Sequence, residues 1–121
     1  MRIALIAHDE QKDNLIDWAT DHEATLDAAA LIATGTTGGR LNDETGLAVT
    51  ELSSGPVGGD LEIGAAVVTG DCDAVFFFRD PMMAQPHEPD ISALLRICDV
   101  HDVPLATNRA SATALLDGLA D

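Results

Sequence analysis

Five short apolar runs alternate with longer mixed segments along the chain. The run RIALIA at residues 2–7 is nearly continuous, as in a strand buried on both faces of a parallel sheet. Four further runs have strand character, at residues 28–33, 47–52, 74–78 and 104–107. Strands that alternate with helical segments predict the α/β class. We expect a single three-layer α/β domain over residues 1–121, with a five-stranded parallel sheet flanked by helices.

The segments between these runs predict the helices. Residues 11–22 carry Leu15, Ile16 and Trp18 at the spacing of a buried helical face. A short helix at 40–45 is expected to end with Gly46 in the C′ position. Further helices are expected at residues 61–68, 91–101 and 110–119. In a sheet of this kind, ligands bind beyond the carboxyl ends of the strands.

Polar residues follow every predicted strand, where such a site would lie. They are His8 and Asp9, Thr34 to Thr37, Ser54 to Asp60, Asp80 to Asp90, and Thr107 with Asn108. The stretch SSGPVGGD at 53–60 suits a loop whose amides and hydroxyls approach a small anion. It ends in one carboxylate, Asp60. The plainer interpretation is a polar loop with Asp60 as a helix N-cap.

Hydroxyls and one cation indicate a phosphate site. Thr34, Gly35, Thr36 and Thr37 offer three hydroxyls and a flexible backbone, and Ser54 with Gly55 adds a hydroxyl and an amide. Lys12, the one lysine of the chain, could join them. The pattern is neither a Walker loop nor a dinucleotide fingerprint. Ordinary turn chemistry remains the alternative for each loop.

Histidines and aspartates supply candidates for proton transfer. His8 and His87 adjoin loop carboxylates, and histidine commonly moves protons near neutral pH. Asp9, Asp60 and Asp90 each begin a predicted helix, so N-capping is their default role. His22 and His101 are interpreted as solvated surface. A metal site built from His8, Asp9, Asp60 and His87 has no supporting local spacing, so we predict no metal.

The charge balance is strongly acidic. The 121 residues include 21 Asp and Glu against 6 Lys and Arg, a formal net charge of −15. Nucleic acid is therefore excluded as a partner, because its binding needs basic surface. No apolar run approaches the ~20 residues of a membrane span, and no signal-peptide pattern is present. The two cysteines lack metal-type spacing, so we expect free thiols, a cytoplasmic location and no membrane partner.

The motifs, taken in order, resemble the methylglyoxal synthase family. They are Ala7-His8-Asp9 with Lys12, Ala33 to Gly38, Ser54 to Asp60, Asp80-Pro81, Pro86 to Asp90, and Ala106 to Asn108. The resemblance covers nearly the whole chain. It implies a Rossmann-like domain, a homohexamer, and no metal or organic cofactor. It also implies conversion of dihydroxyacetone phosphate to methylglyoxal, with inorganic phosphate as product and inhibitor.

The resemblance also implies roles for individual residues. Asp60 corresponds to the catalytic base, and His87 to the histidine that handles protons at the substrate oxygens. Asp9 and Asp90 correspond to carboxylates that line the site. The implied substrate and phosphate contacts are His8, Lys12, Thr34, Gly35, Thr36, Thr37, Ser54, Gly55 and His87. The chain departs from the family at Glu10-Gln11, where a His-Cys pair is common, and at Arg79, where tryptophan is common.

Two other functions fit parts of the pattern. The same fold serves, by resemblance, as a phosphate- or nucleotide-sensing regulatory domain without catalysis. Such a module needs the phosphate loops but neither Asp60 nor His87, so their presence favours an enzyme. A phospho-acceptor receiver domain would share the acidic pocket near Asp9 and Asp80. That fold needs a lysine after its last strand, and this chain has none there.

The acidic surplus predicts salt-dependent stability, as in a salt-adapted protein. Repulsion among unscreened carboxylates destabilises the folded state, and the Debye length falls to about 3 Å at 1 M salt. We expect the melting temperature to rise by roughly 5 °C or more between low and molar KCl. Thermal unfolding followed by circular dichroism over a KCl series measures this. A flat response would show that the protein is merely acidic.

Overall fold

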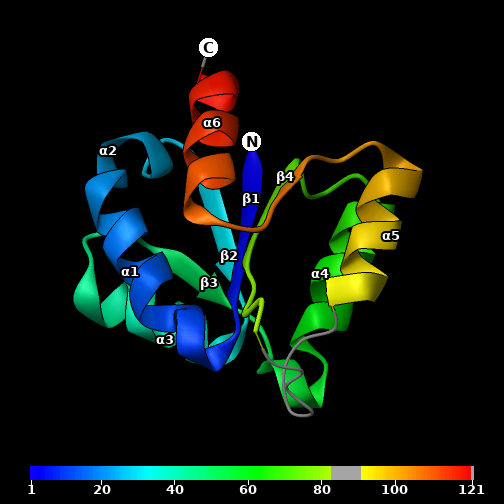
Figure 1. Ribbon diagram of the computed structural model, residues 1–121, viewed down its shortest axis with the longest axis horizontal. Coiled ribbons are helices and arrows are strands. Elements are labelled where there is room, and N and C mark those ends of the chain that lie inside the picture. The colour runs from blue at the N-terminus through cyan, green and yellow to red at the C-terminus, as the bar shows by residue number, and fades with distance from the viewer. Residues whose placement is uncertain (83–90, 121) are drawn as a thin grey trace.

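Five parallel strands form one sheet in the order β3-β2-β1-β4-β5 (Figure 1). This computed structural model describes residues 1–82 and 91–120. The strands are β1 (Arg2–Ala7), β2 (Ala30–Ala33), β3 (Val49–Glu51), β4 (Ala74–Phe78) and β5 (Leu105–Ala106). Every neighbouring pair is parallel, so all the carboxyl ends lie at one edge. The predicted α/β class and the five-stranded parallel sheet are confirmed.

Helices cover both faces of the sheet, with α4 and α5 on one side and the remaining α-helices on the other (Figure 1). They are α1 (Lys12–Asp21), α2 (Glu23–Leu26), α3 (Gly35–Glu44), α4 (Gly59–Val68), α5 (Ile91–His101) and α6 (Arg109–Ala120). Two short 3₁₀ helices, η1 (Asp9–Gln11) and η2 (Gly55–Val57), follow β1 and β3. Among the described residues, no helix has the length and apolar character needed to cross a membrane.

Strand β4 shows how the sheet separates two cores. Successive side chains of a strand point to opposite faces. Phe76 and Phe78 therefore join the core under α1 and α6, whereas Phe77 joins the core under α4 and α5. All three phenylalanines are at most 1% exposed. The continuous apolar run that predicted a doubly covered strand is explained by this burial.

Trp18 anchors α1 to the sheet. Its ring lies 5.3 Å from Phe76 and 5.6 Å from Phe78 between ring centroids, and its indole N–H donates to Thr113 Oγ1 at 3.0 Å. His22 stacks on Trp18 with 4.8 Å between centroids. The interpretation of His22 as solvated surface was therefore wrong, because the ring is half-buried on Trp18. His101 is exposed, as expected.

Both cysteines are buried free thiols. Burial raises the pKa of the Cys98 thiol to about 11 and also raises the pKa of Cys72. Both groups are therefore protonated near neutral pH. A protonated thiol is a poor nucleophile, so Cys72 and Cys98 are packing residues of the core beneath α4 and α5.

Helix α3 begins five residues earlier than the predicted helix at 40–45. Its first turn contains Gly35, Thr36 and Thr37, which were expected in a loop. A Cβ at Gly35 would lie 3.0 Å from the Leu52 carbonyl oxygen, and one at Gly38 would lie 2.9 Å from Glu51 Cγ. Packing against β3 thus requires glycine and offsets its poor helix propensity.

The ends of α3 and α4 also differ from expectation. Thr45 ends α3 in an extended conformation, φ −130° and ψ 172°, so Gly46 does not close the helix in a left-handed conformation. Helix α4 begins at Gly59 rather than at residue 61, after Gly58 with φ 109°. A positive φ suits glycine, which lacks Cβ. Asp60 is therefore the second residue of α4, inside its first turn, and not the N-cap.

Candidate active site

His8 lies where the strand order changes direction, between β1 and β4. Its backbone N–H donates to the Phe78 carbonyl at 3.0 Å, and its Nδ1 accepts the Asp80 backbone N–H at 2.7 Å. The ring makes a T-shaped contact with Phe77, with 5.1 Å between centroids. The side chain is 6% exposed. Backbone and ring contacts to β4 thus fix the orientation of this imidazole.

The contact with Asp80 also determines the tautomer of His8. A backbone N–H can only donate, so Nδ1 must supply a lone pair. Neutral His8 therefore carries its proton on Nε2. The second ring nitrogen is thereby a hydrogen-bond donor at the carboxyl edge of the sheet.

Asp80 belongs to the sequence motifs, but it was not among the predicted catalytic or binding residues. It lies two residues beyond the end of β4, after Arg79, and is 9% exposed. Its Oδ1 accepts the Met82 backbone N–H at 2.9 Å, which shapes the turn after the strand. A carboxylate two positions after a fully apolar run was the available signal. The structure makes Asp80 a support for His8.

Lys12 and Asp9 form an ion pair across the junction of η1 and α1. The Lys12 side chain is 13% exposed and that of Asp9 is 69% exposed. A cation in the first turn of a helix is disfavoured by the helix dipole, and the carboxylate offsets that cost. The predicted Lys12 and Asp9 thus lie together beside His8, at the carboxyl end of β1.

The predicted threonine cluster forms the N-terminus of α3. Thr34 is the N-cap residue, with extended backbone and 4% exposure. Thr37 is fully buried, and within the described chain its Oγ1 has no hydrogen-bond partner. Thr36 is exposed. First-turn amides lack intrahelical partners and attract anions, so this helix end suits a phosphate group.

Ser54 and Gly55 lie against the same helix end. The Gly35 N–H donates to the Ser53 carbonyl at 3.2 Å, which joins the start of α3 to the segment after β3. The Ser54 carbonyl in turn accepts the N–H of Val57 at 3.1 Å and of Gly59 at 3.0 Å. Ser54 and Gly55 are half-buried.

Gly59 brings the first turn of α4, which contains Asp60, onto the first turn of α3. A Cβ at Gly59 would overlap the Ser53 carbonyl and lie 3.0 Å from Thr34 Cγ2. Asp60 is half-buried. The lone carboxylate of the sequence motif therefore enters the helix that packs against the threonine cluster.

Two predicted site residues, His87 and Asp90, lie outside the described residues. Over residues 1–82 and 91–120, no group of three His, Cys, Asp or Glu side chains could hold a metal ion. The structure thus places two groups at one sheet edge. The first is His8, Asp9 and Lys12 after β1, and the second is Thr34 to Thr37, Ser54, Gly55 and Asp60 after β2 and β3. Strands β1 and β2 pair directly, with Leu5 opposite Ala33.

Comparisons with known proteins agree with this architecture. Residues 14–107 match the family model described as an MGS-like domain. The chain is 63% identical over 119 residues to the methylglyoxal synthase of Cupriavidus taiwanensis, covering 98% of this chain and 90% of that protein. It is 59% identical to the methylglyoxal synthase of Acholeplasma laidlawii, covering 98% of each chain. The crystal structure of methylglyoxal synthase from Elizabethkingia anophelis matches with a TM-score of 0.92 at 43% identity, over 95% of this chain and 76% of that one.

The fold and the comparisons define a small α/β domain of the MGS-like class, with a polar site beyond its strand ends. Within that class, the chain belongs to the methylglyoxal synthase family and is an enzyme of the lyase type.

Gly59→Ala should disrupt the packing of α4 on α3. The added methyl group overlaps the Ser53 carbonyl, so we expect a loss of roughly 2–4 kcal/mol in the free energy of unfolding. Gly64→Ala, in the same helix, is the matched control, because its nearest neighbour is Leu94 Cδ2 at 3.9 Å. That change should be neutral or stabilising by about 0.5–1 kcal/mol. Urea denaturation measures both, and equal effects would contradict the close approach.

The tautomer of His8 can be read directly by ¹⁵N NMR of the imidazole. We expect a protonated Nε2 and an unprotonated Nδ1 in the neutral ring. His8→Asn can keep an acceptor for the Asp80 N–H, whereas His8→Gln extends past it. Leaving that buried N–H unpaired costs about 1–3 kcal/mol. Urea denaturation should therefore show the glutamine variant to be less stable, and a protonated Nδ1 would disprove the assignment.

Proposed function

We propose that this chain is a methylglyoxal synthase that converts dihydroxyacetone phosphate into methylglyoxal and inorganic phosphate. The proposal is supported by curated relatives of that name at 58–63% identity over nearly the whole chain. The observation that carries it in this structure is the packing at Gly59, which sets the turn containing Asp60 against the N-terminus of α3. The proposal is supported because a carboxylate and a helix N-terminus suited to an anion lie close together.

The phosphate of the substrate would bind at the start of α3. First-turn amides, the hydroxyls of Thr34, Thr36 and Thr37, and the Ser54 hydroxyl offer donors to its oxygens. Lys12 supplies positive charge from the neighbouring strand end. The buried Thr37 hydroxyl supports this role, because a buried polar group without a partner is costly. Gly35 and Gly55 allow the backbone to approach closely.

Asp60 is the proposed base. It takes a proton from the hydroxymethyl carbon, and the electron pair moves toward the carbonyl oxygen to give an enediolate. That carbon acid is weak, so donors must stabilise the oxyanion as it forms. His87 is proposed to supply a donor and then to move the proton between oxygens. His8 adds its Nε2–H as a fixed donor at the same sheet edge.

Loss of phosphate completes the reaction. The enediolate electrons form a new carbon–carbon double bond as the C–O bond to phosphate breaks, and the resulting enol tautomerises to methylglyoxal. The breaking bond must lie out of the enediolate plane to overlap its π electrons. The hydroxyls and amides around Thr34 and Ser54 would hold the phosphate in that orientation. Lys12 and the helix N-termini stabilise the departing charge.

Asp9 and Asp90 are proposed to line the site, and no metal or organic cofactor takes part. Phosphate, as product, is proposed to inhibit. The enzyme is proposed to act in the cytoplasm as a homohexamer. Apolar side chains exposed on the neighbouring elements η2, α4 and α5 support self-association. They are Val57, Leu61, Val68, Leu95 and Val100.

Asp60→Asn tests the proposed base. The change keeps the shape and removes the proton acceptor, so we expect kcat to fall at least ~10²-fold with phosphate affinity retained. Asp43→Asn, an exposed position on α3, is the charge-matched control and should behave as wild type. Purified protein is incubated with dihydroxyacetone phosphate, with and without EDTA, while methylglyoxal and phosphate are measured together.

Each alternative has its own result in this assay. Near-wild-type turnover by Asp60→Asn would remove Asp60 from the mechanism. Inhibition by EDTA would contradict the absence of a metal. Phosphate binding by the wild-type protein without methylglyoxal formation would support the regulatory-domain alternative.

A further inference from the structure

Helix α1 carries three aspartates at four-residue spacing. Asp13, Asp17 and Asp21 are neighbours on one helical face, where like charges repel. Arginines from two other helices neutralise them. Arg40 of α3 lies 2.8 Å from Asp13, and Arg109 of α6 lies 2.8 Å from Asp17 and 2.9 Å from Asp21. The aspartates of α1 therefore connect it to α3 and α6.

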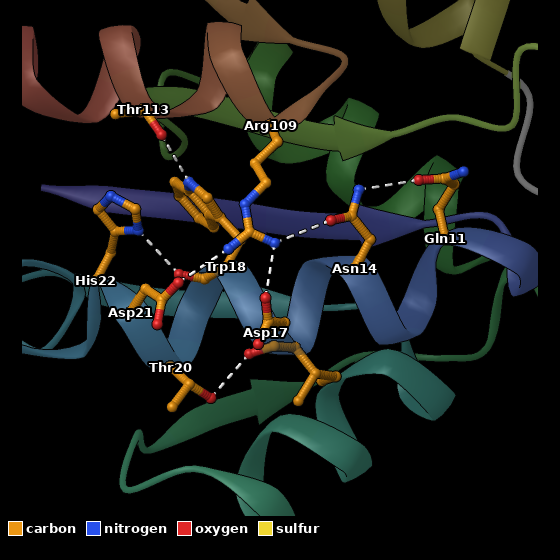
Figure 2. Close-up of polar contacts among 10 residues, drawn as sticks. Gln11, Asn14, Asp17, Trp18, Thr20, Asp21, His22, Arg109 and Thr113 are labelled. Carbon is orange, nitrogen blue, oxygen red and sulfur yellow. Dashed lines mark hydrogen bonds and ion pairs between the residues drawn. The ribbon is translucent and has the colours of Figure 1, made fainter.

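Arg109 makes a further contact that leads toward the proposed active site (Figure 2). Its Nη1 donates to Asn14 Oδ1 at 3.1 Å, and Asn14 Nδ2 donates to Gln11 Oε1 at 3.1 Å. Gln11 is the last residue of η1, and its backbone N–H donates to the His8 carbonyl at 2.8 Å. A continuous set of hydrogen bonds thus runs from α6 to the segment that carries His8, Asp9 and Lys12.

The location of Arg109 is unfavourable without these partners. It is the first residue of α6, and the helix dipole disfavours a cation there. Its side chain is 39% exposed, and single exposed ion pairs contribute little to stability. A planar guanidinium shared among three acceptors on one helix does, however, restrict orientation. The geometry thus restricts the rotation and axial position of α1.

We propose that Arg109 is a positioning residue that sets the placement of Lys12 and η1 relative to the phosphate site at the start of α3. This inference rests on the proposed function for the role of Lys12. Arg109 reaches η1 through the hydrogen bonds of Asn14 and Gln11. It holds α1 in place through its ion pairs with Asp17 and Asp21. Its effect on the reaction is therefore on the binding of phosphate, not on proton transfer at Asp60.

Arg109→Gln is the principal test, with Arg96→Gln as the matched control. Arg96 is exposed on α5, on the opposite face of the sheet, so its loss changes the net charge equally. We expect Arg109→Gln to raise the Kd of inorganic phosphate, measured by calorimetry, roughly threefold to tenfold. The KM for dihydroxyacetone phosphate should rise by a similar factor, with kcat changed less than about twofold. Arg109→Lys should show partial rescue, because lysine keeps the charge without the planar fork.

A double-mutant cycle separates positioning from stability. Gln11→Ala should also raise the Kd of phosphate, and adding Arg109→Gln should have less than the additive effect, because both residues act through Asn14. Kd and KM are measured well below the melting temperature of each variant. If Arg109→Gln lowers the melting temperature but leaves Kd and KM unchanged, the inference is wrong. A different result separates the two proposals. If the wild-type protein makes no methylglyoxal but Arg109→Gln still weakens phosphate binding, the positioning role is upheld and the proposed function is refuted.

Discussion

The arrangement of the candidate site depends on the close packing of two helix N-termini around the carbonyl oxygen of Ser53. This oxygen accepts the N–H of Gly35 at the start of α3, and it lies where a side chain at Gly59 would have to be. The Ser53 carbonyl thus binds the first turn of α3 and lies against the first turn of α4, whose Gly59 N–H donates to the next carbonyl, that of Ser54. Any residue larger than glycine at position 59 would separate Asp60 from the threonine cluster. Close backbone packing builds this part of the site.

Electrostatics organises the other half of the site. The net charge is −15, and the 21 Asp and Glu residues far outnumber the 6 Lys and Arg residues. Lys12 pairs with Asp9, and Arg40 and Arg109 pair with the aspartates of α1. Arg40 also bonds Glu44, which lowers the pKa of that carboxyl group. Cations are therefore concentrated around α1, the helix that starts at Lys12.

The sequence alone predicted the sheet well because burial on both faces leaves a continuous apolar run, as AVFFF at 74–78 shows. It failed at α3, where Gly35 and Gly38 suggested a loop. Local propensity disfavours glycine in a helix, and only the packing against Leu52 and Glu51 reverses that preference. The half-buried His22 was missed although its stacking partner, Trp18, lies only one helical turn earlier in the sequence.

What the sequence by itself determined is the alternation of strands and helices, and hence that polar residues after the strands share one edge. That follows from periodicity and from the parallel arrangement. Only the tertiary structure decided which of these residues meet. The tautomer of His8 depends on a backbone N–H 72 positions away, and the partners of Arg109 lie 88 to 95 positions away. Contacts of such separation depend on the packing of whole elements, which no local pattern encodes.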